Sequence, residues 1–192
     1  VVVKRTINGN TRRFVERMAT LEFTALEDCQ FLDAFRAFDG RNTTATTMTV
    51  TPTGGWAIGA SKTVTASTST FVAGDVGSEI RWTINGVNYG VLITTFASGT
   101  SVTGTLLAAW PAALQNTPRA DWSWARSSFT VAHLPSTAVQ VFGDGRVQAG
   151  ATASAGGVVT TAERLVRGCI GLGYTSKLVT LPVMMQIDGF GQ

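Results

Sequence analysis

Residues 79–96, EIRWTINGVNYGVLITTF, contain the clearest fold signal in this chain. Two runs rich in β-branched and aromatic residues lie on either side of Asn85 and Gly86. Such runs are typical of β-strands. Asn-Gly is the favoured pair in a two-residue hairpin turn, because both turn residues need positive φ. The stretch therefore predicts a β-hairpin that turns at Asn85-Gly86.

The same rhythm of short strands and turns continues on both sides of this hairpin. Further hairpin turns are predicted at Asn8-Gly9 and at Asp144-Gly145. Short strands at this spacing are typical of a sandwich or a barrel, so the predicted fold class is all-β. Further strands are predicted at residues 62–67, 100–107, 138–142, 157–167 and 174–187.

Residues 24–38 fit both helical and alternating spacing. We expect a short turn of helix at about 24–30 there, followed by a strand that ends at Asp39-Gly40. Helix is expected nowhere else.

Composition divides the chain into two predicted units. Thr, Ser and Gly dominate residues 42–127, which we predict to form an inserted β-sandwich or barrel subdomain. Residues 1–41 and 128–192 are predicted to form a second, discontinuous β unit. The core of the insertion is expected to hold Phe71, Ile80, Trp82 and Ile93, apart from a core around Val139 and Leu178.

The chain of 192 residues is 44% apolar but only 14% charged, against about 25% charged in average proteins. Its net charge of +3 is too small to argue nucleic-acid affinity by itself. Five basic residues nevertheless crowd the first segment, and we interpret them as the solvated rim of a hairpin: Lys4, Arg5, Arg12, Arg13 and Arg17. We expect no membrane span, because no run of eighteen apolar residues occurs. The two ends of the sequence suggest an interior piece of a longer polypeptide.

Residues 168–175, GCIGLGYT, raise the question of a phosphate-binding loop. Such a loop needs glycines at a turn from a strand to a helix. The run that follows alternates, is β-branched and closes on Pro182, which predicts a strand. No Gly-Lys-Ser or Gly-Lys-Thr occurs, so a nucleotide site is not predicted.

No catalytic, cofactor or metal site is predicted either. His133 is the single histidine and no Gly-x-Ser-x-Gly motif accompanies it, so we expect a structural role. Cys29 and Cys169 lack the spacing of a zinc site. We expect them to be free buried thiols rather than a disulfide. Asp75 lies in a turn-like stretch and is expected to cap it. The remaining carboxylates are scattered, so nothing nominates a catalytic pair: Glu27, Asp28, Asp33, Asp39, Glu79, Asp121, Asp144, Glu163 and Asp188.

Trp122 and Trp124 stand two residues apart, so in a strand they would project from one face. With Trp56, Trp82 and Trp110 they could form a platform on which sugars or bases stack. The commoner use of tryptophan in a Thr-rich β domain is in the core or in a subunit contact. Both interpretations stay open from the sequence.

Several segments resemble the nozzle proteins of short-tailed bacteriophages, also called tail tubular protein B or stabilisation proteins. Residues 171–182, GLGYTSKLVTLP, are similar to the family pattern Gly-Leu-Pro-Tyr-Thr-Ser-x-Leu-x-Thr-Leu-Pro, with Gly173 in place of proline. Upstream, Val141-Phe142-Gly143-Asp144-Gly145 resembles the family's Val-x-x-Asp-Gly hairpin. Ala132-His133-Leu134 resembles the family's His-Leu-Glu-Gly segment, although Pro135 and Ser136 stand here in place of Glu-Gly. Further similar segments are 3–9, 13–16, 31–33, 38–40 and, as a module inserted in some relatives, 71–81.

The resemblance implies a virion component of the phage tail. It implies a hexamer around a central channel, below the portal and adaptor proteins and near the tail fibres or spikes. Double-stranded DNA would pass through that channel without sequence-specific binding. It also implies that the chain has no catalytic activity. The glycines at 168, 171 and 173 are then expected to let the chain bend between two strands. A carbohydrate- or receptor-binding β module of a phage tail is the alternative, and a hydrolase is a weaker third.

Overall fold

The computed structural model describes residues 2–15, 24–28, 32–52 and 54–173. Strands make up 56% and short helical turns 5%, which confirms the predicted all-β fold class. The first helical turn, η1, precedes strand β3 at Asp33–Asp39, as the sequence predicts for this segment. The helical turns are η1 (Leu26–Asp28), η2 (Ala73–Asp75) and η3 (Ala112–Leu114), so the prediction of helix only at about 24–30 is wrong for the two short turns η2 and η3.

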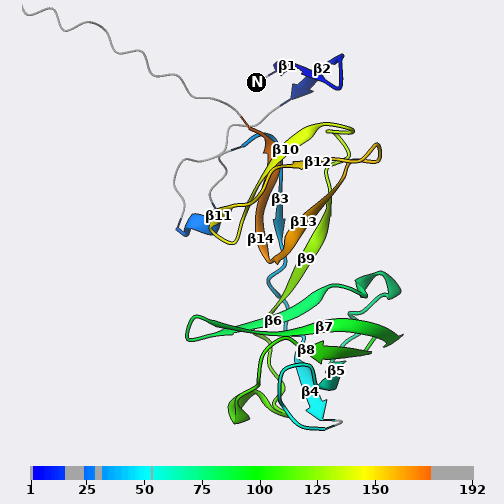
Figure 1. Ribbon diagram of the computed structural model, residues 1–192, viewed down its shortest axis with the longest axis vertical. Helices are drawn as coiled ribbons and strands as arrows, with labels where there is room; N and C mark the ends of the chain where they lie inside the picture. The colour runs from blue at the N-terminus through cyan, green and yellow to red at the C-terminus, as the bar shows by residue number, and fades with distance from the viewer. Residues whose placement is uncertain (1, 16–23, 29–31, 53, 174–192) are drawn as a thin grey trace, which may run out of the picture.

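The described strands form three antiparallel sheets (Figure 1). The first is the hairpin of β1 (Val2–Ile7) and β2 (Asn10–Val15). The second has the order β11 (Arg146–Val147), β10 (Ala138–Gly143), β14 (Arg167–Leu172) and β3, with β12 (Ala151–Thr152) beside β10. The third has the order β13 (Val158–Leu165), β9 (Trp122–Thr130), β6 (Glu79–Ile84), β7 (Val87–Ser98), β8 (Ser101–Leu106), β5 (Ser61–Ala66) and β4 (Met48–Pro52).

The three predicted hairpin turns are confirmed. They connect β1 to β2, β6 to β7 and β10 to β11. Both central residues of each turn have the positive φ that the two-residue turn requires, with φ values of 46° and 73° at Asn8-Gly9, 50° and 77° at Asn85-Gly86, and 50° and 78° at Asp144-Gly145.

One lobe, here called the barrel lobe, consists of β4 to β8 and the first half of β9. Along β5 and β8 buried and exposed side chains alternate, so one face of each strand lines the core. The sheet nearly closes on itself, because the backbone of Met48 exchanges hydrogen bonds of 2.8 and 3.0 Å with Arg119, just before β9. The buried core includes Met48, Val50, Val64, Phe71, Ile80, Trp82, Val91, Ile93, Val102, Leu106, Trp110, Leu114 and Trp122.

The other lobe, the sandwich lobe, consists of β3, β10 to β14 and the second half of β9 (Figure 1). Its five-stranded sheet packs against β9 and β13. Across the two layers, Phe38 of β3 lies with its ring centroid 4.2 Å from that of Phe129 of β9. The core between the layers includes Ile7, Val131, Leu134, Val139, Val141, Val159, Leu165 and Ile170.

The residues chosen from the sequence as core of the insertion lie together in the structure. Phe71, Ile80, Trp82 and Ile93 belong to the barrel-lobe cluster, whereas Val139 belongs to the sandwich-lobe cluster. Leu178 lies outside the described residues. Strand β9 contributes to both lobes, so the change from one lobe to the other takes place within a strand.

The lobes are joined where the chain crosses between them beside β9. The amide of Gly40 donates to the carbonyl of Val166, and the amide of Trp124 donates to the carbonyl of Gly40, both at 2.7 Å. A Cβ on residue 40 would lie 2.1 Å from the carbonyl oxygen of Trp124. Only glycine fits this crossing, because the two backbones touch.

A buried ion network reinforces the junction. Arg81 of β6 donates from Nε to Oε1 of Glu79 at 2.7 Å and from Nη2 to Oε2 at 3.2 Å. It also reaches the sandwich lobe, at Asp144 Oδ2 (3.1 Å) and at the carbonyl of Arg164 (3.0 Å). Burial lowers the pKa of the Arg81 guanidinium, but its bonds to Glu79 and Asp144 outweigh burial and raise that pKa, so the group stays charged.

Strand β14 corrects the sequence analysis. Residues 157–167 were expected as a strand and 168–173 as a bend, but β13 ends at Leu165 and a new strand runs from Arg167 to Leu172 between β10 and β3. Its glycines allow close approach and do not form a bend. A Cβ at Gly168 would lie 2.0 Å from the carbonyl oxygen of Phe142. The strand expected at 174–187 lies outside the described residues.

Candidate functional site

His133 has the structural surroundings that the sequence suggested. Its Nε2 lies 2.6 Å from the carbonyl oxygen of Ala34, and its ring packs edge-on against Phe14 with centroids 6.3 Å apart. The imidazole therefore ties the loop after β9 to β3 and to the β1–β2 hairpin.

Every carboxylate whose side chain the structure describes lies within ion-pair distance of an arginine. The pairs are Asp28 with Arg41 and Arg167, Asp33 with Arg5, Asp39 with Arg41, Asp75 with Arg126, Glu79 and Asp144 with Arg81, Asp121 with Arg119, and Glu163 with Arg146.

The effect of this pairing is clearest at two surface carboxyls. The hydrogen bond from the Arg41 side chain lowers the pKa of Asp39, and the hydrogen bond from the Arg119 side chain lowers the pKa of Asp121. Both groups therefore stay ionised at neutral pH, unlike a general acid, whose pKa must lie near the working pH.

Asp75 caps a turn, which confirms its expected role. Its Oδ2 accepts the backbone amide of Val72 at 2.9 Å, at the start of η2. Its Oδ1 lies 3.2 Å from Nη2 of Arg126, across the junction between the lobes.

The tryptophans do not form an exposed platform. Trp82, Trp110 and Trp122 are buried in the barrel-lobe core, and the indole N–H of Trp122 donates to the carbonyl of Thr46 at 2.9 Å. Trp56 and Trp124 are half-buried against the same core. Trp124 is therefore the one member of the predicted Trp122–Trp124 pair with surface to offer a ligand.

Cys169 is buried in β14, and Cys29 lies outside the described residues. Among the residues that the structure describes, no group of three or more His, Cys, Asp or Glu side chains is arranged to hold a metal ion.

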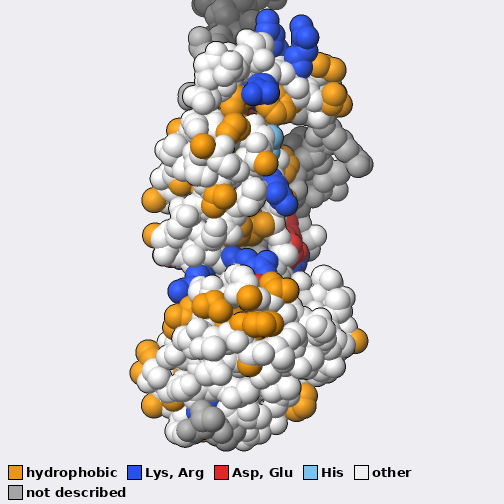
Figure 2. All heavy atoms as spheres, turned by 90° about the vertical axis from the view of Figure 1, so that its right-hand side faces the viewer, with side chains coloured by type: hydrophobic (Ala, Val, Ile, Leu, Met, Phe, Trp, Pro, Cys, Tyr) orange, Lys and Arg blue, Asp and Glu red, His pale blue; other side chains and the backbone are white. Residues whose placement is uncertain are grey.

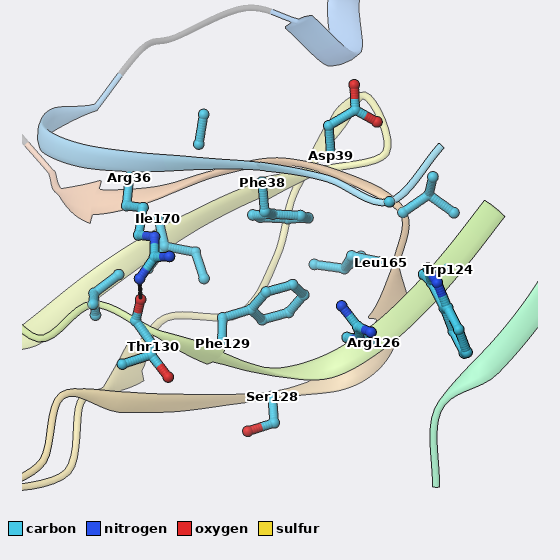
Figure 3. A pocket seen from close by; sticks show the side chains of 14 residues that line it. Arg36, Phe38, Asp39, Trp124, Arg126, Ser128, Phe129, Thr130, Leu165 and Ile170 are labelled. Atoms are coloured by element: carbon cyan, nitrogen blue, oxygen red, sulfur yellow. Dashed lines mark hydrogen bonds between the residues drawn. The ribbon is translucent and has the colours of Figure 1, made fainter. Parts of the chain in front are cut away.

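A cavity of about 320 Å³, here called the waist cavity, opens between β3 and β9 near the junction of the lobes (Figure 3). Phe38 and Phe129 face each other inside it, with Leu165 and Ile170 close by. Trp124 and Arg126 lie at one end, where the Arg126 guanidinium carbon is 5.0 Å from the Trp124 ring centroid. Arg36 lies at the other end and donates from Nη1 to the carbonyl of Thr130 at 2.7 Å.

The lining of the waist cavity combines positive charge with aromatic surface. Two arginines beside an aromatic floor suit a small group that carries a negative charge and an apolar face. The volume lies near the lower end of the range of small-molecule sites, about 300–1,000 Å³. Ser128 and Thr130 bring hydroxyl groups to the lining, and no imidazole of the described chain lies among the lining residues.

The β1–β2 hairpin is the second feature with binding potential. One face packs on the sandwich lobe through Ile7, Phe14 and Arg5, whose Nε lies 2.9 Å from Oδ2 of Asp33. Lys4, Arg12 and Arg13 remain exposed. Figure 2 shows Lys and Arg side chains gathered at the end of the molecule near the hairpin and again at the waist.

The basic hairpin is visible in the sequence, whereas the waist cavity is not. Arg36 and Phe38 stand two apart in β3, as do Arg126 and Ser128 in β9. This spacing indicates a shared strand face, but nothing local shows that the two strands face each other across two layers.

No protein-family model matches the chain, and no curated protein matches it either. No helical segment within the described ranges is long and apolar enough to cross a membrane.

Proposed function

We propose that this chain is a structural protein of a short-tailed bacteriophage tail and forms part of the nozzle conduit through which genomic DNA is retained and ejected. One observation carries the proposal. The described residues of the segments that resemble the nozzle family are distant in sequence, yet some of them lie in neighbouring strands of one sheet: Phe38 and Asp39 in β3, Val141 to Gly143 in β10, and Gly171 and Leu172 in β14. Chance similarity in scattered segments has no reason to assemble into one folded unit.

The architecture supports a mechanical role. The lobes share strand β9, and the junction adds a buried ion network around Arg81 together with the pair of Asp75 and Arg126. An extended antiparallel sheet with such ties resists bending between the lobes. The sparse charge leaves a wall of mostly neutral polar groups, which suits a surface past which a polyanion must slide.

The proposed assembly is a hexameric ring around a central channel in the virion tail. It would contact the portal and adaptor proteins on one side and tail fibre or spike proteins on the other. The chain is not an enzyme in this proposal and carries no cofactor. DNA passes without recognition of its sequence.

A carbohydrate- or receptor-binding β module is the second candidate, and the waist cavity favours it. Half-buried Trp124 lies beside Arg126, with Arg36 at the far end of the cavity, so the site offers an aromatic surface and two cations that suit a sugar with a carboxylate. A panel of neutral and acidic oligosaccharides tests this directly. Binding that is lost in Trp124→Ala, in a variant that keeps its unfolding midpoint, would favour this candidate.

The leading proposal is tested on virus particles made from the genome that encodes the chain. Peptides of the chain should be found in purified particles, and antibodies raised against the barrel lobe should label the tail. Absence of the chain from intact particles, or label on the capsid shell, would refute the proposal.

A further inference from the structure

The strand pairing of the β1–β2 hairpin places positively charged side chains directly opposite each other. The strand register places Lys4 directly opposite Arg13 and Arg5 directly opposite Arg12. Like charges directly opposite each other across a strand pair are destabilising. The isolated hairpin therefore gains nothing from this arrangement, and an external anion would relieve the repulsion.

The hairpin is anchored firmly enough to present these charges in a fixed position. Ile7 is 2% exposed in the sandwich-lobe core, and the Arg5 side chain, 10% exposed, pairs with Asp33. The anchored face thus uses one arginine internally. Lys4 and Arg13 project from the opposite face, whereas Arg12 lies opposite Arg5 on the anchored side and is itself exposed there.

The rest of the described chain does not compensate these charges. Lys4, Arg12 and Arg13 make no ion pair with any described residue, whereas each carboxylate described for this chain already has an arginine partner. The described carboxylates of a second copy are likewise already neutralised by arginines, so they are weak partners for these cations. Charge complementarity therefore points to an anion from outside the chain.

We propose that the three exposed cations of the β1–β2 hairpin, Lys4, Arg12 and Arg13, bind the phosphodiester backbone of double-stranded DNA. The inference rests on the proposed function, which brings duplex DNA past the chain. Long flexible cations suit phosphates spaced regularly along a strand. The hairpin exposes no aromatic ring for stacking, since Phe14 is packed against His133, so the contact reads charge and not sequence.

The strength of the contact follows from the number of charges. Three phosphate contacts predict that log Kobs falls against log salt concentration with a slope of about −2.7. Affinity should therefore drop about 40-fold between about 50 and about 200 mM salt. Such a contact holds DNA at low salt and lets it slide at physiological salt.

The experiment measures binding of the whole chain to a fluorescent duplex of about 20 base pairs by anisotropy across that salt range. The test variant is Lys4→Gln/Arg12→Gln/Arg13→Gln. The matched control, Arg36→Gln/Arg119→Gln/Arg146→Gln, removes the same charge from the two lobes. The test variant should keep or raise its unfolding temperature, because it loses the repulsion between Lys4 and Arg13.

The proposal expects the salt slope to fall toward zero in the hairpin variant and to stay near the parent value in the control. Equal losses in both variants would overturn it, because binding would then follow net charge alone. Polyglutamate provides the second arm as a probe for an acidic protein. A protein partner could also cover Val2 and Val15, which are exposed and flank the Lys4–Arg13 pair on the same face. Tighter hairpin-dependent binding to polyglutamate than to DNA would assign the hairpin to an acidic protein and overturn the DNA proposal. Either failure leaves the presence of the chain in virus tails untouched, because that is measured on particles.

Discussion

Replacing Arg81 by methionine is expected to destabilise the protein more than any comparable change at an exposed ion pair. Arg81 and Glu79 have side chains only 13% and 7% exposed, and they share two hydrogen bonds. Methionine keeps most of the apolar stem but removes the cation, so the buried carboxylate of Glu79 loses its partner.

The expected magnitude follows from that unpaired carboxylate. Removal of one partner of a buried ion pair costs about 3–5 kcal/mol. We expect about 3 kcal/mol, because Asp144, the second carboxylate on Arg81, is 27% exposed and can regain water. At this chain length the loss corresponds to a fall in melting temperature of roughly 6–12 °C.

Urea unfolding of the parent and of Arg81→Met measures the loss directly. The matched control is Arg119→Met, which breaks the pair with Asp121 on the surface, where the two side chains are 30% and 51% exposed. That control should cost less than about 1 kcal/mol. The double variant Glu79→Gln/Arg81→Met should recover part of the loss, because no buried charge remains.

Equal losses in Arg81→Met and Arg119→Met would refute the reasoning that burial makes the junction network strong. A double variant as unstable as the sum of its two single changes would also refute it, since the two residues would then act independently.

Three further predictions concern backbone packing, acid stability and DNA. Gly168→Ala should either prevent folding or lower the free energy of unfolding in urea by more than about 3 kcal/mol, because the added Cβ meets the Phe142 carbonyl oxygen. The control Gly55→Ala has open space around the added Cβ and should change that free energy by less than about 0.5 kcal/mol. A stable Gly168→Ala would contradict the account of β14. The lowered pKa of Asp121 means that its pair with Arg119 stabilises the fold above the usual carboxyl pKa of 3.8 and loses that effect as pH falls through the lower folded value. Arg119→Gln should therefore unfold earlier than the parent at pH 7, and the gap should close in acid; a gap that widens in acid would have the wrong sign. The chain should bind duplex DNA without sequence preference and only weakly at physiological salt, and a dissociation constant below about 1 µM in an anisotropy titration would contradict a passive conduit.

The features that the sequence predicts well are those decided by near neighbours in the chain. Asn85-Gly86 and Asp144-Gly145 need only local backbone preferences to form their turns, and both have the expected positive φ. Alternation of apolar residues likewise identifies β5 and β8, because successive side chains of a strand point to opposite faces and only one face is buried.

The features that the sequence misses depend on contacts between distant residues. Gly168 looks like a bend from its neighbours, yet its role is set by the backbone of Phe142 on the adjacent strand. The Arg81–Asp144 pair joins residues of different lobes, and the waist cavity exists only because β3 and β9 face each other. Local pattern carries none of this information.

The central claim is that the chain is part of a ring-shaped nozzle on a phage tail. Electron cryo-microscopy of tails released from purified particles tests it most directly. The account predicts a six-fold ring around the tail axis, with density that fits the barrel and sandwich lobes in every subunit and an open channel wide enough for duplex DNA. Density for the two lobes on a tail fibre or spike away from the axis, or a ring of another symmetry, would contradict the claim.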